Sequence, residues 1–176
     1  LGGGSVDYGD RGGPDQKLLT YTSAPLDSAI EVTGAPVVTL HMASTHPDGA
    51  VFAYLEAVAP DGRSTYLSEG QLRLTLRGPP GPRNSPTGVS PSFLRADMAP
   101  LQPGVAFEAG IRLHAVSAMV PRGDRLRIAI GGADADTFAR YPAEGAPTWR
   151  IRRTAAAPSY VDLPQADWSG PSAATR

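Results

Sequence analysis

The chain has 176 residues, of which 16 are Lys or Arg and 17 are Asp or Glu, so its formal net charge is −1 at pH 7. This length predicts one domain, and a hydrophobic fraction of 41% is enough to build its core. A near-neutral chain lacks the basic surface that nucleic-acid binding needs, and no apolar run approaches the ~18 residues of a membrane span. Because there is no Cys, disulfides, thiolate metal sites and cysteine nucleophiles are excluded. We therefore expect no nucleic-acid and no membrane partner. The composition does not distinguish a cytoplasmic from a secreted protein.

The two ends of the chain differ in composition from its middle. Residues 1–16 contain six Gly and few apolar side chains, so they cannot bury enough surface to offset the entropy lost on ordering. Residues 165–176 are rich in Ser, Ala and Gly, which is typical of a terminus that frays. We therefore predict a linker or exposed strap over 1–16, one folded domain over 17–164 and a flexible tail over 165–176.

Between these ends, short segments alternate apolar and polar residues with a period of two. The clearest is Gln71–Arg77, in which three Leu alternate with polar neighbours, as a half-buried strand requires. Three further segments share this pattern, and others are rich in β-branched and aromatic residues between turn signals. No segment shows a sustained period of 3.6, so no long helix is expected. The predicted strands are Leu18–Thr22, Ile30–Thr33, Val37–Ala43, Val51–Val58, Ser64–Leu67, Gln71–Arg77, Phe107–His114, Arg125–Ile130, Trp149–Arg152 and Tyr160–Leu163.

The connections between these strands carry specific turn signals. Pro60-Asp61-Gly62 predicts a tight hairpin turn after Val51–Val58, and Pro47-Asp48-Gly49 predicts a second hairpin turn before that strand. The Pro-rich segment 78–104 exceeds ordinary hairpin length, which is typical of a crossover between sheets or of a functional loop. Antiparallel strands with one wet face must pack their apolar face on a second sheet. Together with 20 Gly and 18 Pro, the pattern predicts an all-β sandwich or jelly roll.

A self-sufficient serine hydrolase is not expected. Its nucleophile sits in a G-x-S-x-G elbow, because small flanking residues let the strained turn close. Ser64, Ser68 and Ser90 each satisfy only half of that motif. The three histidines, which would have to supply any general base, fall on the polar sides of strands or in a turn. We predict no catalytic residue within this chain.

The segment 131–149 carries two further signals. Asp134 and Asp136 bring two carboxylates together after a strand, but the other acidic ligands of a calcium loop are missing, so a turn is favoured and no metal or cofactor is predicted. Phe138, Tyr141 and Trp149 lie on or beside one loop and could form a sugar-stacking platform. Core or interface packing explains such aromatics more often.

Three long sequence segments, followed by Trp149 and one short segment, occur in a specific order. They read LLTYTSAPLDSAIEVTGAPVVTLHMAS, AYLEAVAPDGRSTYLSEGQLRLTLR and PSFLRADMAPLQPGVAFEAGIRLHAVSAMVPRGDRLRIAIGGADADTFARYP, followed by Trp149 and PSYVDLP. In this order and spacing they resemble the C-terminal domain of the X-Pro dipeptidyl-peptidase and cocaine esterase (CocE/NonD) family over about residues 16–164. The opening residues are also similar to the strap that enters this domain.

The resemblance implies a jelly-roll β-sandwich of two antiparallel sheets, of the galactose-binding-domain-like kind. It also implies a bacterial parent enzyme, a serine hydrolase that acts on acyl esters or X-Pro peptides and whose triad lies upstream, in an α/β-hydrolase domain of the same polypeptide. This domain would then help to wall the substrate cleft and/or mediate homo-oligomerisation. The residues expected at the cleft wall or interface are Asp134, Asp136, Phe138, Arg140, Tyr141, Trp149, Phe93 and Arg95.

An alternative interpretation stays open at this point, a free-standing β-sandwich module that binds a carbohydrate or another ligand. The coding sequence upstream of Leu1 distinguishes the two hypotheses. A G-x-S-x-G elbow with Asp and His supports the accessory domain, and a start codon beside Leu1 supports the module.

Overall fold

The computed structural model describes residues 8–78, 91–135 and 137–166, which form thirteen β-strands and three short 3-10 turns but no α-helix. No helix in these ranges is long and apolar enough to cross a membrane. The strands are β1 (Leu19–Thr22), β2 (Ile30–Gly34), β3 (Val37–Ser44), β4 (Ala50–Val58), β5 (Ser64–Arg73), β6 (Ala106–Arg112), β7 (Val116–Val120), β8 (Arg125–Gly131), β9 (Trp149–Ile151), β10 (Arg153–Thr154), β11 (Ala157–Pro158), β12 (Tyr160–Asp162) and β13 (Gln165–Ala166). The turns are η1 (Pro14–Lys17), η2 (Leu74–Leu76) and η3 (Arg95–Asp97).

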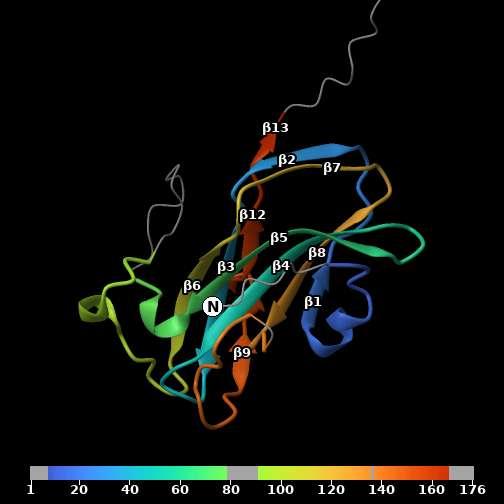
Figure 1. Ribbon diagram of the computed structural model, residues 1–176. Helices are drawn as coiled ribbons and strands as arrows, with labels where there is room; N and C mark the ends of the chain where they lie inside the picture. Colours follow the sequence, from blue (N-terminus) through green and yellow to red (C-terminus); the bar gives the residue numbers. More distant parts are fainter. Residues whose placement is uncertain (1–7, 79–90, 136, 167–176) are drawn as a thin grey trace, which may run out of the picture.

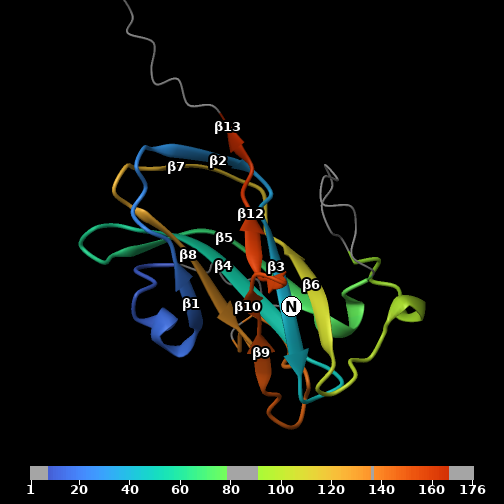
Figure 2. The same cartoon turned by 180° about the vertical axis from the view of Figure 1, so that it is seen from behind.

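The strands build two facing antiparallel layers (Figure 1). One layer has the order β1-β8-β4-β5, and the other has the order β12-β3-β6, with β9 paired to the end of β3. A third sheet, β13-β2-β7, continues the second layer, because β2 leads into β3, β6 into β7 and β12 into β13 (Figure 2). The connections β3–β4, β5–β6 and β7–β8 each pass from one layer to the other, which confirms the predicted jelly-roll sandwich.

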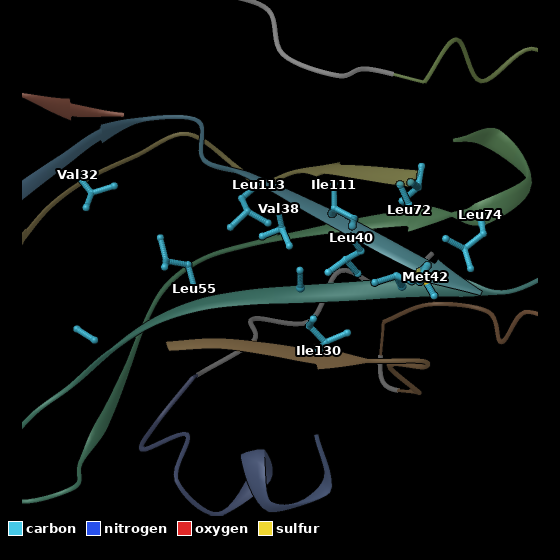
Figure 3. Packing of buried hydrophobic residues seen from close by; sticks show 14 of the residues in the cluster. Val32, Val38, Leu40, Met42, Leu55, Leu72, Leu74, Ile111, Leu113 and Ile130 are labelled. Carbon is cyan, nitrogen blue, oxygen red and sulfur yellow. The ribbon is translucent and has the colours of Figure 1, made fainter. Parts of the chain in front are cut away.

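The hydrophobic core lies between the two layers (Figure 3). The alternation along each strand sends one set of side chains inward, so Val38, Leu40 and Met42 of β3 meet Leu55 of β4 and Ile130 of β8. Each of these five side chains is at most 4% exposed. Burial of this apolar surface stabilises the fold by about 1.5–3 kcal/mol per large side chain.

One side of the sandwich is closed by close contact between β5 and the end of β6. The Ser68 hydroxyl donates a hydrogen bond to the His114 carbonyl (2.6 Å), and the His114 amide donates to the Glu69 carbonyl (2.8 Å). Gly70 lies at this junction, and a Cβ placed there would be 2.3 Å from the carbonyl oxygen of Arg112. Only glycine lets the two backbones approach so closely.

Every residue of β4 is buried, because both faces of this strand are covered. Val51, Ala53 and Leu55 face the core, whereas Phe52 and Tyr54 belong to a second cluster on the outer face of the same sheet. Leu18, Tyr66 and Phe138 complete that outer cluster. The N-terminal segment and the loop after β8 therefore cover the outer face of the sheet.

Three expectations from the sequence need correction. The strand predicted over Gln71–Arg77 ends at Arg73, and Leu74–Leu76 forms η2, whose buried Leu74 still reaches the core. Pro47-Asp48-Gly49 makes no hairpin, because β3 and β4 belong to different sheets. Gln165 and Ala166, predicted as the start of a flexible tail, form β13 and pair with β2, whereas residues 167–176 of that prediction lie outside the described residues. The sequence analysis did not predict β7, β10, β11 or β13. The last three have two residues each, too few for an alternation to be visible.

Candidate functional site

A cleft of about 950 Å³ lies where the N-terminal segment faces the loops around β9. Tyr54 and Ile130 contribute to its lining from β4 and β8. One wall is the segment from Arg11 to Leu19, and the other is formed by residues 131–135 and 140–151. The loops at one end of the sandwich thus meet the chain that enters the domain, an arrangement typical of binding sites on rigid scaffolds.

The strap wall is held by buried ionic contacts. Arg11, which is 7% exposed, donates from Nε to Glu56 Oε1 at 2.9 Å, and Glu56 is fully buried on β4. The Ser64 hydroxyl donates to the other oxygen of Glu56 at 2.8 Å. Asp15 lies 3.5 Å from Arg11 and receives a hydrogen bond from Arg127 of β8 at 3.0 Å. These contacts fix residues 11–15 on the outer face of the sheet.

Two aromatic side chains extend this attachment. The Tyr8 ring stacks on the Tyr66 ring with centroids 4.2 Å apart, and the Tyr8 hydroxyl donates to Glu69 at 2.5 Å. The Arg11 guanidinium lies 4.2 Å from the centroid of the Tyr54 ring. A cation over an aromatic face adds attraction that does not depend on a carboxylate. The segment expected to be an exposed strap is therefore packed on the sheet from Tyr8 onward.

Burial changes the ionisation of this region. Removal from water, together with the neighbouring Asp15 carboxyl, raises the pKa of Glu56 to about 7, while the hydrogen bonds from Ser64 and Arg11 act in the opposite direction. Burial and the hydrogen bond to Asp134 raise the pKa of Tyr54 well above its ordinary value. Tyr54 therefore stays protonated and donates to Asp134 at 2.9 Å, which links β4 to the wall opposite the strap.

The opposite wall is fixed by its own contacts. The Trp149 ring packs against Gly49 and Gly132, positions at which a Cβ would lie 3.3–3.8 Å from the ring. Arg73, paired with Asp48 at 2.6 Å, places its guanidinium 4.0 Å from the centroid of the Tyr141 ring. This pairing raises the pKa of Arg73 further, so the cation persists at any accessible pH.

The structure brings together four of the eight residues predicted from the sequence. Asp134, Arg140, Tyr141 and Trp149 all line the cleft. Arg140 donates to the carbonyl of Gly145, which closes its loop. Phe138 does not line the cleft but packs behind it on Phe52, with ring centroids 5.1 Å apart.

Of the remaining three predicted residues, two lie away from the cleft and one is not among the residues that the structure describes. Phe93 is 75% exposed and lines a separate hollow beside His114, and Arg95 is an exposed residue of η3. Both belong to the crossover between β5 and β6 and do not line the cleft. Asp136 lies outside the residues that the structure describes.

The side chains that line the cleft are charged, aromatic, aliphatic or small. Among the described residues that line it, three are cationic, Arg11, Lys17 and Arg140, one is acidic, Asp134, and none is a serine, threonine or histidine. Elsewhere His41 contacts Glu108 at 3.3 Å. Across the described ranges no three potential ligands gather around a metal position. The sequence did not predict Arg11 and Lys17 at this site, because a glycine-rich segment gives no pattern that shows where it packs. Tyr54 was also not predicted, because it lies in an apolar run that indicates only a buried strand.

Comparison with known proteins supports the inferred family. The family model for the X-Pro dipeptidyl-peptidase C-terminal non-catalytic domain matches residues 12–162. Proteins of Mycobacterium bovis and Mycobacterium tuberculosis, each named as a serine esterase, are 48% identical to the chain over 168 residues, covering 92% of the chain and 26% of the relative. The cocaine esterase of a Rhodococcus species is 28% identical over 140 residues, covering 76% of the chain and 21% of that protein. The chain thus spans about a quarter of the length of these relatives.

Solved structures share the fold at low sequence identity. An aminopeptidase from a marine sediment archaeon, Thaumarchaeota archaeon, superposes with a TM-score of 0.73 at 20% identity, covering 90% of the chain and 28% of that protein. A CocE/NonD family hydrolase from Staphylococcus aureus gives a TM-score of 0.70 at 14% identity, covering 90% and 32%. Because the family model covers residues 12–162, the chain belongs to the family of X-Pro dipeptidyl-peptidase C-terminal non-catalytic domains.

Proposed function

We propose that this chain is the accessory domain of a serine hydrolase of the esterase or dipeptidyl-peptidase type and forms one wall of its substrate cleft. The observation that carries the proposal is the cleft of about 950 Å³, lined by four predicted wall residues and by no nucleophile or histidine among its described lining residues. Such a surface binds and orients, and leaves the proton chemistry to a triad supplied by an upstream α/β-hydrolase domain.

The chemistry of the lining supports contact with a substrate. Tyr141 is 36% exposed, and the Arg73 guanidinium, paired with Asp48, packs on its ring. Because the ring is already held in place, binding a ligand against it costs little ordering entropy. Trp149 adds a second aromatic surface. An ester or X-Pro peptide offers apolar groups that such aromatics cover, while Arg140 and Lys17 supply positive charge beside them.

The test compares the 176-residue chain with the polypeptide extended upstream through the hydrolase domain, on a panel of nitrophenyl esters and X-Pro nitroanilides. We expect the chain alone to be inactive and the extended protein to be active. In the extended protein, Tyr141→Ala should raise KM about threefold to tenfold with a smaller change in kcat, because it removes binding rather than chemistry.

Arg122→Ala is the matched control, since Arg122 is exposed in the turn between β7 and β8 and does not line the cleft. Activity in the chain alone, or equal kinetics of Tyr141→Ala and the parent protein on every substrate, would contradict the proposal. Self-association of the domain stays a prediction, and sedimentation of the same extended protein tests it.

A further inference from the structure

The sandwich is not closed on both sides. Opposite the β5–β6 contact, an apolar groove of about 380 Å³ runs between β1 and β8 of one layer and β3 and β12 of the other. Its lining includes the buried side chains Val38, Leu40 and Leu55, which point into the space between the layers (Figure 3). The groove is thus a part of the hydrophobic core that opens to the surface.

The size of this opening sets it apart from ordinary packing defects. Protein interiors contain few voids larger than a water molecule, and a water occupies about 30 Å³. Small-molecule pockets start at about 300 Å³. At about 380 Å³ the groove falls in the range of a ligand site, too large for a defect.

The lining of the groove is mostly apolar, with a few polar groups and one charged residue. Leu126, Ile128, Val161 and Leu163 extend the apolar walls. The polar contribution comes from hydroxyl groups and from one charged residue, Arg153. The Arg153 guanidinium lies 5.3 Å from the centroid of the Tyr21 ring, which is part of the wall.

No carboxylate occurs among the described residues that line the groove. A positive charge beside an apolar channel is complementary to a molecule with a carboxylate at one end and a hydrocarbon body. A peptide segment fits this site less well, because its backbone amides would enter walls made mostly of hydrocarbon and lose hydrogen bonds there.

We propose that this groove binds a medium-chain aliphatic carboxylate, with the hydrocarbon chain between the two layers and the carboxylate at Arg153. The site is separate from the cleft described above, with which it shares only Ile130. The proposal does not depend on the chain's role in a hydrolase.

The experiment titrates the 176-residue chain by calorimetry with hexanoate, octanoate, decanoate and dodecanoate below their micelle concentrations. Affinity should rise about fourfold for each methylene buried, the change that ~0.8 kcal/mol produces, until the groove is full. Decanol, which has the same chain and no charge, should bind about tenfold more weakly than decanoate. Methyl signals of Leu126 and Ile128 should shift on binding, because both residues line the groove.

Arg153→Gln and Arg150→Gln form a matched pair, since both arginines are exposed on neighbouring strands and only Arg153 lines the groove. Arg153→Gln should weaken decanoate binding about tenfold and leave decanol binding unchanged, whereas Arg150→Gln should change neither by more than twofold. Leu126→Trp, which places a larger side chain in the wall of the groove, should abolish binding of both ligands. The absence of saturable binding, equal affinity for decanoate and decanol, or equal effects of the two Gln variants would each overturn the proposal.

Discussion

Glu56 is a carboxylic acid placed where water cannot solvate its charge. Its two oxygens accept hydrogen bonds from Arg11 and Ser64, and Asp15 lies close enough to disfavour a second negative charge. A buried ion pair of this kind contributes less through its own attraction than it costs when one partner is removed. The main effect of these ionic contacts is therefore to fix the position of the strap on the sheet, rather than to add net stability.

Removing Arg11 tests that cost. In Arg11→Met two buried carboxyl groups lose a cation, and we expect the free energy of unfolding to fall by about 3–5 kcal/mol. Urea denaturation at pH 7 measures it, with Arg122→Met as the exposed control. Adding Glu56→Leu to the variant should restore part of the loss, because Glu56 is the carboxyl group that Arg11→Met leaves without a cation, whereas Asp15 keeps Arg127. A loss below about 1 kcal/mol would argue against a buried pair.

The pH dependence of stability tests the ionisation of Glu56. The folded-state pKa of about 7 lies above the ordinary value of 4.5, so the folded chain binds more protons than the unfolded chain between these values. The contribution of this group is therefore greatest at or below pH 4.5 and declines as pH rises to about 7. Glu56→Gln, which mimics the protonated acid, should remove that decline in urea unfolding series. Glu144→Gln, at an exposed position, should retain it.

At the scale of elements, β5 and the end of β6 are in close backbone contact at Gly70. Gly70→Ala would place a methyl group 2.3 Å from a backbone oxygen that cannot rotate away, so β5 must separate from the end of β6. We expect a loss of about 2–3 kcal/mol in thermal or urea unfolding. Gly13→Ala is the control, because a Cβ there meets nothing within 4 Å and should change stability little.

The strands differ in how visible they are in the sequence. Arg125–Gly131 alternates apolar and polar residues because its outer face is partly wet, and the alternation predicted this strand to within one residue. Ala50–Val58 shows no alternation except Glu56, since both of its faces are covered. That lone acid within an apolar run was the one signal that a cation would approach the outer face. The cation comes from a segment whose glycines predict only flexibility.

The cleft was partly predictable for the same reason. Asp134, Arg140, Tyr141 and Trp149 are close in sequence, so a loop followed by a strand brings them to one place. Arg11 and Tyr54 join them only through pairing between distant segments, which local patterns do not encode. Phe93 and Arg95 were expected beside them as residues of another long loop, and the crossover to β6 places both outside the lining of the cleft.

At the scale of the whole molecule, the N-terminal strap completes the outer layer of the sandwich. Removal of residues 1–17 would expose Tyr54 and leave Glu56 without Arg11. We expect the truncated chain to unfold at a clearly lower urea concentration than the full chain. A synthetic peptide of residues 8–18 should restore stability in proportion to its concentration, whereas the same peptide with Arg11→Ala should not. Identical unfolding of the truncated and full chains would show that the strap is dispensable.

The distance along the chain between the strap and its partners also sets when this domain can form during synthesis. Asp15 is bound by Arg127, 112 positions later, and β1 pairs with β8. At about 5–20 residues per second, a ribosome needs on the order of 5–20 s to make the intervening chain. β4 is made partway through this interval, and until the segment after β8 follows, Tyr54 and Phe52 of β4 are open to other nascent chains. The contact of the strap with β8 therefore forms only after most of the domain has been synthesised.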